Sequence, residues 1–439
     1  MDILLKIIQV ILSLSLLVLV HEFGHYITAR IFRIRVEKFY LFFPPAILKF
    51  KPKKSDTEFG IGCIPLGGFC KISGMIDESM DKEAMAKPPQ PWEFRSRPAW
   101  QRIIVLAGGV LMNVVLAIVL YIAILFTWGE QYIKNDDVIY GIEVSPLAKE
   151  IGFENGDRIL ALDGNPAPDN FNEIHMDMLR DQVSRVTVLR DGDTVDIHID
   201  PAYMPAMLNT PGMFGIRLPI AVGSLPDTSI NAGADLRQGD RFLTAAGRPV
   251  CWHQDLQAVL ADNAGSTVEL RLLRGADTVT VPVRVSGDGK IEVLLQRDIS
   301  DITITDKEYS LLEAIPAGFM MTFTNIGHYV KELGLIFSPQ TEAYKSVGSF
   351  IAIGSIFPSS WNWQIFWNIT ALLSIMLAVM NLLPIPALDG GHILFTLYEM
   401  ITGRKPSDRF MEVAQMIGMF LLLMIMILAF GNDILRLFR

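Results

Sequence analysis

Four long, predominantly apolar stretches constrain this chain more than any other feature, because each can form a helix that crosses a lipid bilayer. A spanning helix needs about 20 predominantly apolar residues. The first stretch begins at Ile7 and reaches that length only if it continues through a polar cluster to Ala29. The other three are Ile103–Phe126, Gln364–Leu388 and Val413–Asn432. The sequence therefore predicts a polytopic α-helical membrane protein with four transmembrane helices.

The composition agrees with a membrane protein that also has a water-exposed portion. Hydrophobic residues make up 51% of the 439 residues and charged residues only 19%, a balance that is unusual for a globular protein in water. The net charge of −9 argues against nucleic-acid binding as the main task. Cys63, Cys70 and Cys251 are too few and too scattered for a disulfide framework or a thiolate metal site.

The polar cluster inside the first stretch is His21-Glu22-Phe23-Gly24-His25. On a helix its two histidines share one face, which suits two ligands of a single zinc ion, with Glu22 beside them as a candidate general base. Ionisable groups at membrane depth are costly and by default functional. A cleaved signal peptide is the alternative interpretation, but no small-residue cleavage site follows the apolar run.

A catalytic zinc site usually has three protein ligands, so a third is expected at the same depth in the membrane. In the third stretch, Pro384 and Pro386 should break the helix, and Asp389 follows the break. With four crossings, the C-terminal ends of the first and third helices lie on the same face of the membrane, which makes Asp389 the candidate ligand. Two alternatives stay open: Asp389 caps the next helix, or His392 is the ligand instead.

Basic residues predict which membrane face is cytoplasmic. They follow the first helix, precede the second and lie between the third and fourth, in the ranges 30–54, 95–102 and 404–409. Cytoplasmic loops are enriched in Lys and Arg, so the zinc site is predicted toward the cytoplasmic side. The shorter apolar stretch Ile315–Ile326 is expected to be an interfacial amphipathic helix rather than a fifth span.

Two segments between the first and second helices predict a small cytoplasmic or membrane-associated β-sheet. Val36–Lys49 and Glu58–Ser73 alternate in hydrophobicity and are rich in Phe, Ile and Tyr, as strands are. One interpretation is an ordinary antiparallel sheet. The other is a sheet that dips toward the zinc and offers an edge strand, to which an extended substrate segment adds through main-chain hydrogen bonds.

From about Gln131 to Gln296 the composition is that of water-exposed domains, and it contains an internal repeat. Gly152–Leu160 recurs as Ala234–Leu243, with Gly156 and Gly239 in matching positions 83 residues apart. Each copy is followed by a helical segment and then by strands. This passage resembles the PDZ domain and predicts two tandem PDZ-like domains on the outer side of the membrane. They either bind extended peptides along a sheet edge or act as spacers or steric guards.

The predicted domain order follows from these assignments. It runs through residues 1–130 (first helix, sheet and second helix), 131–212 and 213–300 (PDZ-like domains), 301–363 (amphipathic or interfacial segment) and 364–439 (third and fourth helices).

Taken together, these motifs resemble the site-2 protease family of intramembrane zinc metalloproteases, and the resemblance covers nearly the whole chain. It rests on the histidine cluster, on the sequence from Asn381 to Gly390, and on the tandem PDZ-like domains. Pro65–Phe69 and Arg97–Arg102 also match. One departure lies in the second helix, where Val110 replaces a proline that usually precedes the family's asparagine, here Asn113. A kink in that helix is therefore in doubt.

The resemblance implies a zinc metalloendopeptidase that acts in regulated intramembrane proteolysis. Zn²⁺ would be held by His21, His25 and Asp389, Glu22 would be the catalytic base, and Asn381 and Pro384 would contact an extended substrate. Implied substrates are single-pass membrane proteins, such as anti-sigma factors or remnant signal peptides. The implied location is the bacterial inner membrane, with the PDZ-like domains in the periplasm.

Two other functions account for only part of the sequence. A membrane-anchored PDZ scaffold would bind extended peptides without proteolysis, but it has no need for Glu22. A soluble metalloprotease is contradicted by the four spanning stretches.

Overall fold

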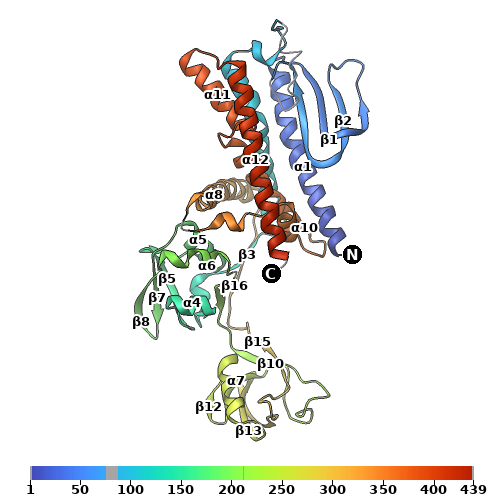
Figure 1. Cartoon of the computed structure of the whole chain (residues 1–439). Coiled ribbons are helices and arrows are strands. Elements are labelled where there is room, and N and C mark those ends of the chain that lie inside the picture. Colours follow the sequence, from blue (N-terminus) through green and yellow to red (C-terminus); the bar gives the residue numbers. More distant parts are fainter. Residues whose placement is uncertain (1, 76–87, 211, 340, 438–439) are drawn as a thin grey trace. The chain divides into compact units, whose positions relative to one another are not determined.

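The computed structural model of the chain describes residues 2–75, 88–210, 212–339 and 341–437. It divides into two compact units (Figure 1). Unit 1 comprises Met1–Glu130 and Lys307–Arg439, and unit 2 comprises Gln131–Asp306.

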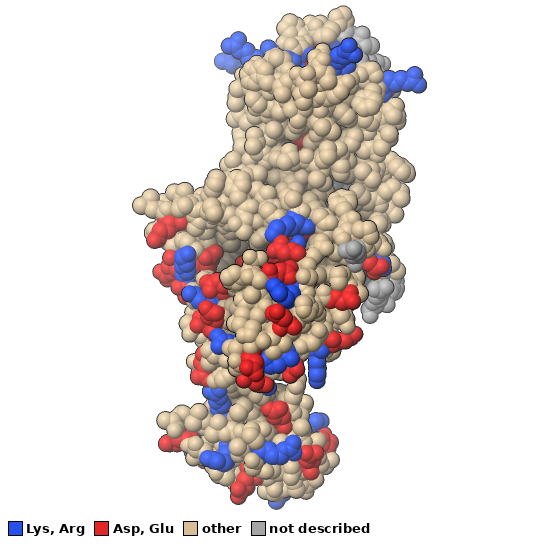
Figure 2. Space-filling view, turned by 90° about the vertical axis from the view of Figure 1, so that its left-hand side faces the viewer, with Lys and Arg blue, Asp and Glu red and all other residues tan. Residues whose placement is uncertain are grey.

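Unit 1 is built on long apolar helices. Within the described residues, four of them are long and apolar enough to span a membrane, the same number as the spanning helices predicted from the sequence. They are α1 (Asp2–Ile31), α3 (Ala99–Trp128), α10 (Trp363–Leu382) and α12 (Asp408–Leu437). Shorter elements are η1 (Phe94–Ser96), η5 (Ala343–Ser346), α9 (Phe350–Ile356) and α11 (Asp389–Thr402). Figure 2 shows a broad surface of this unit almost free of charged side chains, with Lys and Arg gathered along one end.

α3 is the central helix of unit 1 and contacts α1, α8, α10 and α11. It crosses α1 where two glycines face each other. A Cβ on Gly24 would lie 2.2 Å from the Gly108 carbonyl oxygen, and one on Gly108 would lie 2.6 Å from that of Gly24. Small residues allow membrane helices to approach this closely. α3 is continuous through Val110, so the missing proline leaves an unbroken helix.

The third spanning helix ends where its prolines predict. α10 stops at Leu382, a non-helical segment carries Pro384 and Pro386, and α11 begins at Asp389. Proline lacks the N–H that a helix interior requires, and its ring clashes with the preceding turn. This break turns the chain so that α11 packs against α3.

The strands β1 (Val36–Phe50) and β2 (Glu58–Ile72) form the predicted antiparallel sheet, which packs against α1. Each strand bends, so that four stretches lie side by side. The first half of β1 pairs with both halves of β2: Phe39 lies opposite Phe59 on one side and Cys70 on the other. The stretch Gly68–Ile72 is therefore an outer edge of the sheet.

The predicted short helix Ile315–Ile326 is part of a longer one. α8 (Leu311–Phe337) starts at a capping box formed by Ser310 and Glu313. It continues past His328, Lys331 and Glu332, the polar residues that follow the apolar stretch, because charged and polar side chains can occupy one face of an amphipathic helix. α8 is not among the four candidate spans of the described residues, and it packs against α3 and α10.

Unit 2 contains two lobes, each with its own hydrophobic core. The elements of the first lobe are β4 (Ile142–Val144), α4 (Pro146–Ile151), β5 (Arg158–Leu162), β6 (Asn165–Pro166), α5 (Ile174–Arg180), β7 (Arg185–Arg190), β8 (Asp193–His198), α6 (Met204–Leu208) and β9 (Phe214–Ile216). The second contains β10 (Ile220–Ser224), β11 (Arg241–Ala245), β12 (Arg248–Pro249), α7 (His253–Asp262), β13 (Thr267–Arg274), β14 (Asp277–Arg284) and β15 (Leu294–Arg297). The strands β3 (Glu130–Ile133) and β16 (Ile304–Lys307) lie at the ends of the unit.

The first lobe extends beyond residue 212. Its last strand, β9, pairs with β4, and Met213 belongs to the first core. The second lobe repeats this arrangement, since β15 pairs with β10. In both lobes the last strand thus pairs with the first strand of the lobe; β4 and β9 form a two-stranded sheet of their own, whereas β15 lies at the edge of the larger sheet of the second lobe.

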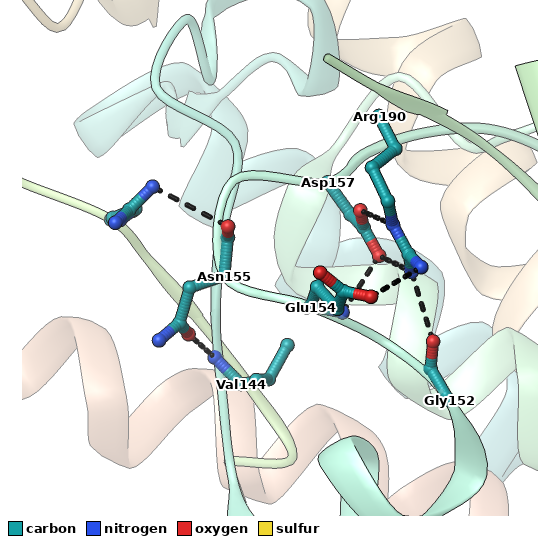
Figure 3. Close-up of polar contacts among 7 residues, drawn as sticks. Val144, Gly152, Glu154, Asn155, Asp157 and Arg190 are labelled. Carbon is teal, nitrogen blue, oxygen red and sulfur yellow. Dashed lines mark hydrogen bonds and ion pairs between the residues drawn. The ribbon is translucent and has the colours of Figure 1, made fainter. Parts of the chain in front are cut away.

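The internal repeat corresponds to a repeated arginine clamp. In the first lobe, Arg190 donates to the buried Asp157, to Glu154 and to the Gly152 carbonyl oxygen (Figure 3). In the second lobe, Arg274 makes the corresponding bonds to Asp240, to the Asp235 side chain and to the Asp235 carbonyl oxygen. The aspartate of each repeated Gly-Asp-Arg passage is thus neutralised by an arginine at the end of a later strand.

Candidate metal centre

Three side chains from two distant parts of the sequence converge beside α3. The Nε2 atoms of His21 and His25 are 3.2 Å apart. Oδ2 of Asp389 lies 3.3 Å from Nε2 of His21 and 3.4 Å from Nε2 of His25. Among the described residues, these three form a group whose ligand atoms all lie within 4.8 Å of one another. The structure thus brings together the three residues that the sequence predicted as ligands.

The triangle formed by these atoms has the dimensions of a tetrahedral zinc site. At the usual Zn–N and Zn–O distances of about 2.0–2.2 Å, tetrahedral ligand atoms lie roughly 3.3–3.6 Å apart. The Asp389 Oδ2 atom is buried and has no hydrogen-bond partner. Buried polar atoms are nearly always satisfied, so an oxygen and two nitrogens converging in this way fit a cation between them.

His25 is oriented for coordination by a main-chain contact. Its Nδ1 lies 2.9 Å from the carbonyl oxygen of Val105 on α3. A carbonyl oxygen only accepts, so Nδ1 carries the proton, and in the neutral ring Nε2 keeps its lone pair. Metal-binding histidines are usually held in this way by a partner on the other ring nitrogen.

His21 has two asparagine neighbours. The Nδ1 atom of His21 lies 3.4 Å from the side-chain amide nitrogen of Asn113, which is fully buried on α3. Its Nε2 lies 3.4 Å from the amide nitrogen of Asn381, in the last turn of α10. Asn381, predicted to contact substrate, therefore lies beside the candidate metal site. Pro384 lies in the segment between α10 and α11 and is exposed.

Asp389 occupies the first turn of α11 rather than the capping position. The residue at the N-cap is Leu388, whose side chain accepts no hydrogen bond. Asp389 instead directs Oδ2 at the two histidines. His392, the competing ligand, lines the same cavity but is outside the three-residue group found in the described part of the chain.

A cavity of about 360 Å³ opens at the three residues. Glu22 and the outer edge of β2 line it, and α12 contributes the amide of Gln415. The wall consists of His21, Glu22, His25, Phe43, Gly68–Ile72, Met75, Ala387–Asp389, His392 and Gln415. The glutamate proposed as a base, the candidate metal ligands and an edge strand thus share one space.

Sequence reasoning did not identify two further residues at this site. Gly109 on α3 leaves room for the imidazoles, since a Cβ there would lie 2.5 Å from Nε2 of His25 and 2.6 Å from Cε1 of His21. Gln415 is 3% exposed and interrupts an apolar run. Its position as an amide near the start of the uncharged stretch Val413–Asn432 was the available signal.

The chain is similar to known peptidases along nearly its whole length. Peptidase family M50 matches residues 9–425. A protein of Xylella fastidiosa named as a zinc metalloprotease is 31% identical over 458 residues, covering 99% of both chains. The regulator of sigma-E protease of Escherichia coli is 28% identical over 449 residues, covering 97% of this chain and 98% of that protein. A protein of Neisseria meningitidis, also named as a zinc metalloprotease, is 28% identical over 448 residues, with coverage of 97% and 98%.

Proposed function

Because this chain belongs to peptidase family M50 and is an intramembrane zinc metalloprotease, we propose that His21, His25 and Asp389 hold the zinc ion and that Glu22 is the general base. The observation that carries this assignment is the triangle of Nε2, Nε2 and Oδ2 atoms with sides of 3.2, 3.3 and 3.4 Å. Four spanning helices place the site in a membrane protein.

Each residue around the triangle has a separate role in peptide hydrolysis. Bound zinc supplies Lewis acidity for the attacking water and for the scissile carbonyl. Glu22 follows His21 directly and lines the same cavity, so its carboxylate accepts the proton of the water and passes it to the leaving amine. The amide of Asn381, beside Nε2 of His21, donates to the carbonyl oxygen as negative charge develops there. Pro384 keeps the adjoining segment out of the helix, where it contacts the substrate.

The edge of β2 provides a place for an unwound substrate. A helical segment hides its peptide carbonyls, so it must be extended before hydrolysis. The stretch Gly68–Ile72 is an outer edge of the sheet and also lines the cavity. Main-chain pairing with this edge replaces helical hydrogen bonds that the substrate loses, and it places the scissile bond within the space that holds Glu22.

The names of the relatives and the four candidate spanning helices support a substrate class. A relative of similar length is named regulator of sigma-E protease, and the two candidate histidine ligands lie within the spanning helix Ile3–Ile31. The substrates are single-pass membrane proteins of the anti-sigma-factor or remnant-signal-peptide type. The protein resides in the bacterial inner membrane, with the zinc site toward the cytoplasm, because the loops adjoining that end are rich in Lys and Arg.

The two lobes of unit 2 are PDZ-like domains on the periplasmic side. Support comes from the repeated arginine clamp and from the matching pairings β4–β9 and β10–β15. A cavity of about 540 Å³ lies against β15 and the start of α7, and Glu143 and Arg217 of the first lobe also line it. An edge strand beside a helix is the arrangement that binds extended peptides, so this cavity takes a segment of a substrate or of a partner protein.

The deciding experiment compares wild type with Glu22→Gln, using the purified full-length protein and a single-pass helix as substrate, with and without a chelator. We expect the wild type to cleave only without chelator, and Glu22→Gln to lose cleavage while its zinc content stays equal to wild type. Wild-type turnover by Glu22→Gln would refute the assigned base.

A second experiment tests the third ligand. When zinc is measured on Asp389→Ala and on His392→Ala, only Asp389→Ala should have lost zinc.

A peptide-binding scaffold without proteolysis would give a different outcome. Wild type would then bind the single-pass helix without cleaving it, and neither the chelator nor Glu22→Gln would change the result.

A further inference from the structure

Asn113 lies on α3 directly behind His21. Its side chain is fully buried, and its amide nitrogen lies 3.4 Å from Nδ1 of His21. The amide oxygen has no hydrogen-bond partner. Its main-chain carbonyl oxygen accepts a hydrogen bond from Ser374 on α10, at 2.8 Å, which fixes the helix backbone at this point. A buried amide in a spanning helix is costly unless it has a role.

The identity of the amide atom that faces His21 follows from metal binding. If Nε2 coordinates zinc, the neutral imidazole carries its only proton on Nδ1. If the amide N–H pointed at that Nδ1–H, two hydrogen-bond donors would face each other and neither could accept. A rotation of the amide by 180° exchanges its oxygen and nitrogen without moving any other atom. The oxygen then accepts from Nδ1–H at the same separation.

We propose that Asn113 is a positioning residue that accepts a hydrogen bond from Nδ1–H of His21 and so holds Nε2 available for zinc. This rests on the proposed ligand role of His21. One helix then fixes both imidazoles, because the Val105 carbonyl oxygen, two turns earlier on α3, accepts from Nδ1 of His25. Gly109, between these two residues, leaves the space in which both rings lie.

The role predicts opposite results for two substitutions of nearly the same shape. Asn113→Asp keeps an oxygen that accepts from Nδ1–H, whereas Asn113→Leu keeps the volume and removes the acceptor. Loss of such an outer partner typically lowers metal affinity about 10–100-fold. We therefore expect Asn113→Leu to bind zinc about 10–100-fold more weakly than wild type, and Asn113→Asp to stay within about threefold of wild type. A packing role alone predicts that the leucine is the better tolerated of the two.

The measurement is chelator competition for zinc on the full-length protein in detergent, with the absorption spectrum of the cobalt-substituted protein as a second readout of ligand geometry. Ser374→Ala is the matched control, because it removes the contact to the Asn113 main chain and leaves the amide in place; it should retain wild-type affinity. His21→Ala reports on the ligand assignment itself. If His21→Ala keeps its zinc, the proposed function fails; if only Asn113→Leu keeps it, this inference fails.

A measurement on wild type keeps the test independent of how the variants fold. With ¹⁵N-labelled histidine in the zinc-loaded protein, the His21 ring should carry its proton on Nδ1 and the metal on Nε2. A proton on Nε2 of His21 would overturn the inference. So would an Asn113→Asp variant that is folded but as weak in zinc binding as Asn113→Leu, because the amide N–H would then be the group that matters.

Discussion

Arg102 and Glu399 form a buried ion pair that joins α3 to the later turns of α11, with Nη2 of the arginine 2.6 Å from Oε1 of the glutamate. Their side chains are only 9% and 15% exposed. α11 begins with Asp389, about 15 Å along the helix axis from Glu399 at 1.5 Å per residue. The pair therefore fixes the far end of the helix whose first turn supplies the third candidate ligand.

Removal of one partner of this ion pair should destabilise the protein far more than replacement of both partners by apolar residues. Glu399→Ala leaves the guanidinium of Arg102 buried without its carboxylate, and we expect a loss of about 3 kcal/mol in stability. The double variant Arg102→Met, Glu399→Leu should be much closer to wild type, because a buried pair can be replaced by apolar groups at little cost. Thermal unfolding of the full-length protein measures both. Equal losses in the two variants would show that charge pairing is not the relevant contact.

Gly109 gives a prediction that is confined to the metal site. Gly109→Ala places a Cβ 2.5 Å from Nε2 of His25, which must displace one or both imidazoles. We expect zinc affinity to fall by at least about tenfold, the smallest loss usual when ligand orientation is disturbed. Gly334→Ala on α8 is the matched control, because a Cβ there meets nothing within 4 Å and alanine favours the helix by about 1 kcal/mol. Similar zinc affinities in the two variants would contradict the prediction.

The arginine clamp of the second lobe gives a prediction on pH and stability. Burial would raise the pKa of Asp240, but the hydrogen bonds and charge of Arg274 hold it below its usual value. A carboxylate with a lowered pKa in the folded state stabilises the fold above its unfolded pKa of about 3.9, and this stabilisation is lost as the pH falls through the folded value. In Arg274→Met, burial dominates, so the second lobe should instead lose stability as the pH rises from about 4 to 7.

Hydrogen exchange resolves the effect by lobe. At neutral pH we expect Arg274→Met to lower the protection of β11 and β13 by about 3 kcal/mol, because the buried Asp240 charge is left unpaired. The amides of β5 and β7 serve as the internal control, since the first lobe has its own clamp in Arg190 and Asp157. Unchanged protection of β11 and β13 at neutral pH would show that the clamp is dispensable.

The sequence predicted those features that depend on local pattern and on the chemistry of the lipid bilayer. Apolar length identified the four spans, and strand alternation identified β1 and β2 to within a residue or two. Four crossings put the C-terminal ends of the first and third helices on the same membrane face, and the two prolines end the third helix just before Asp389. This was enough to associate Asp389 with the histidines, because few segments can reach the same depth in the membrane. The three candidate ligands could be predicted without information on how unit 2 folds.

Other features depend on contacts between distant segments, which a single sequence does not reveal. The role of Gly109 follows from which face of α3 meets α1, and helix periodicity does not determine a partner when a helix is apolar on all sides. The full length of α8 was missed because its polar residues indicated an end. β9, which pairs with β4, lies beyond the predicted boundary at residue 212, and its three residues are too few to show strand alternation.

Gln415 is the polar side chain that α12 contributes to the cavity, and it gives a prediction that separates substrate contact from metal binding. It is 3% exposed and lines the same space as Glu22 and the edge of β2, yet it is not one of the three candidate ligands in the described part of the chain. Gln415→Leu should therefore leave zinc affinity unchanged and raise KM about tenfold, the loss expected when one hydrogen bond of about 1–1.5 kcal/mol to the extended substrate is removed. Steady-state cleavage of a single-pass helix and chelator competition measure the two quantities. The neighbouring exposed Met416→Leu is the control and should alter neither; zinc loss in Gln415→Leu would instead place this amide among the groups that support the metal.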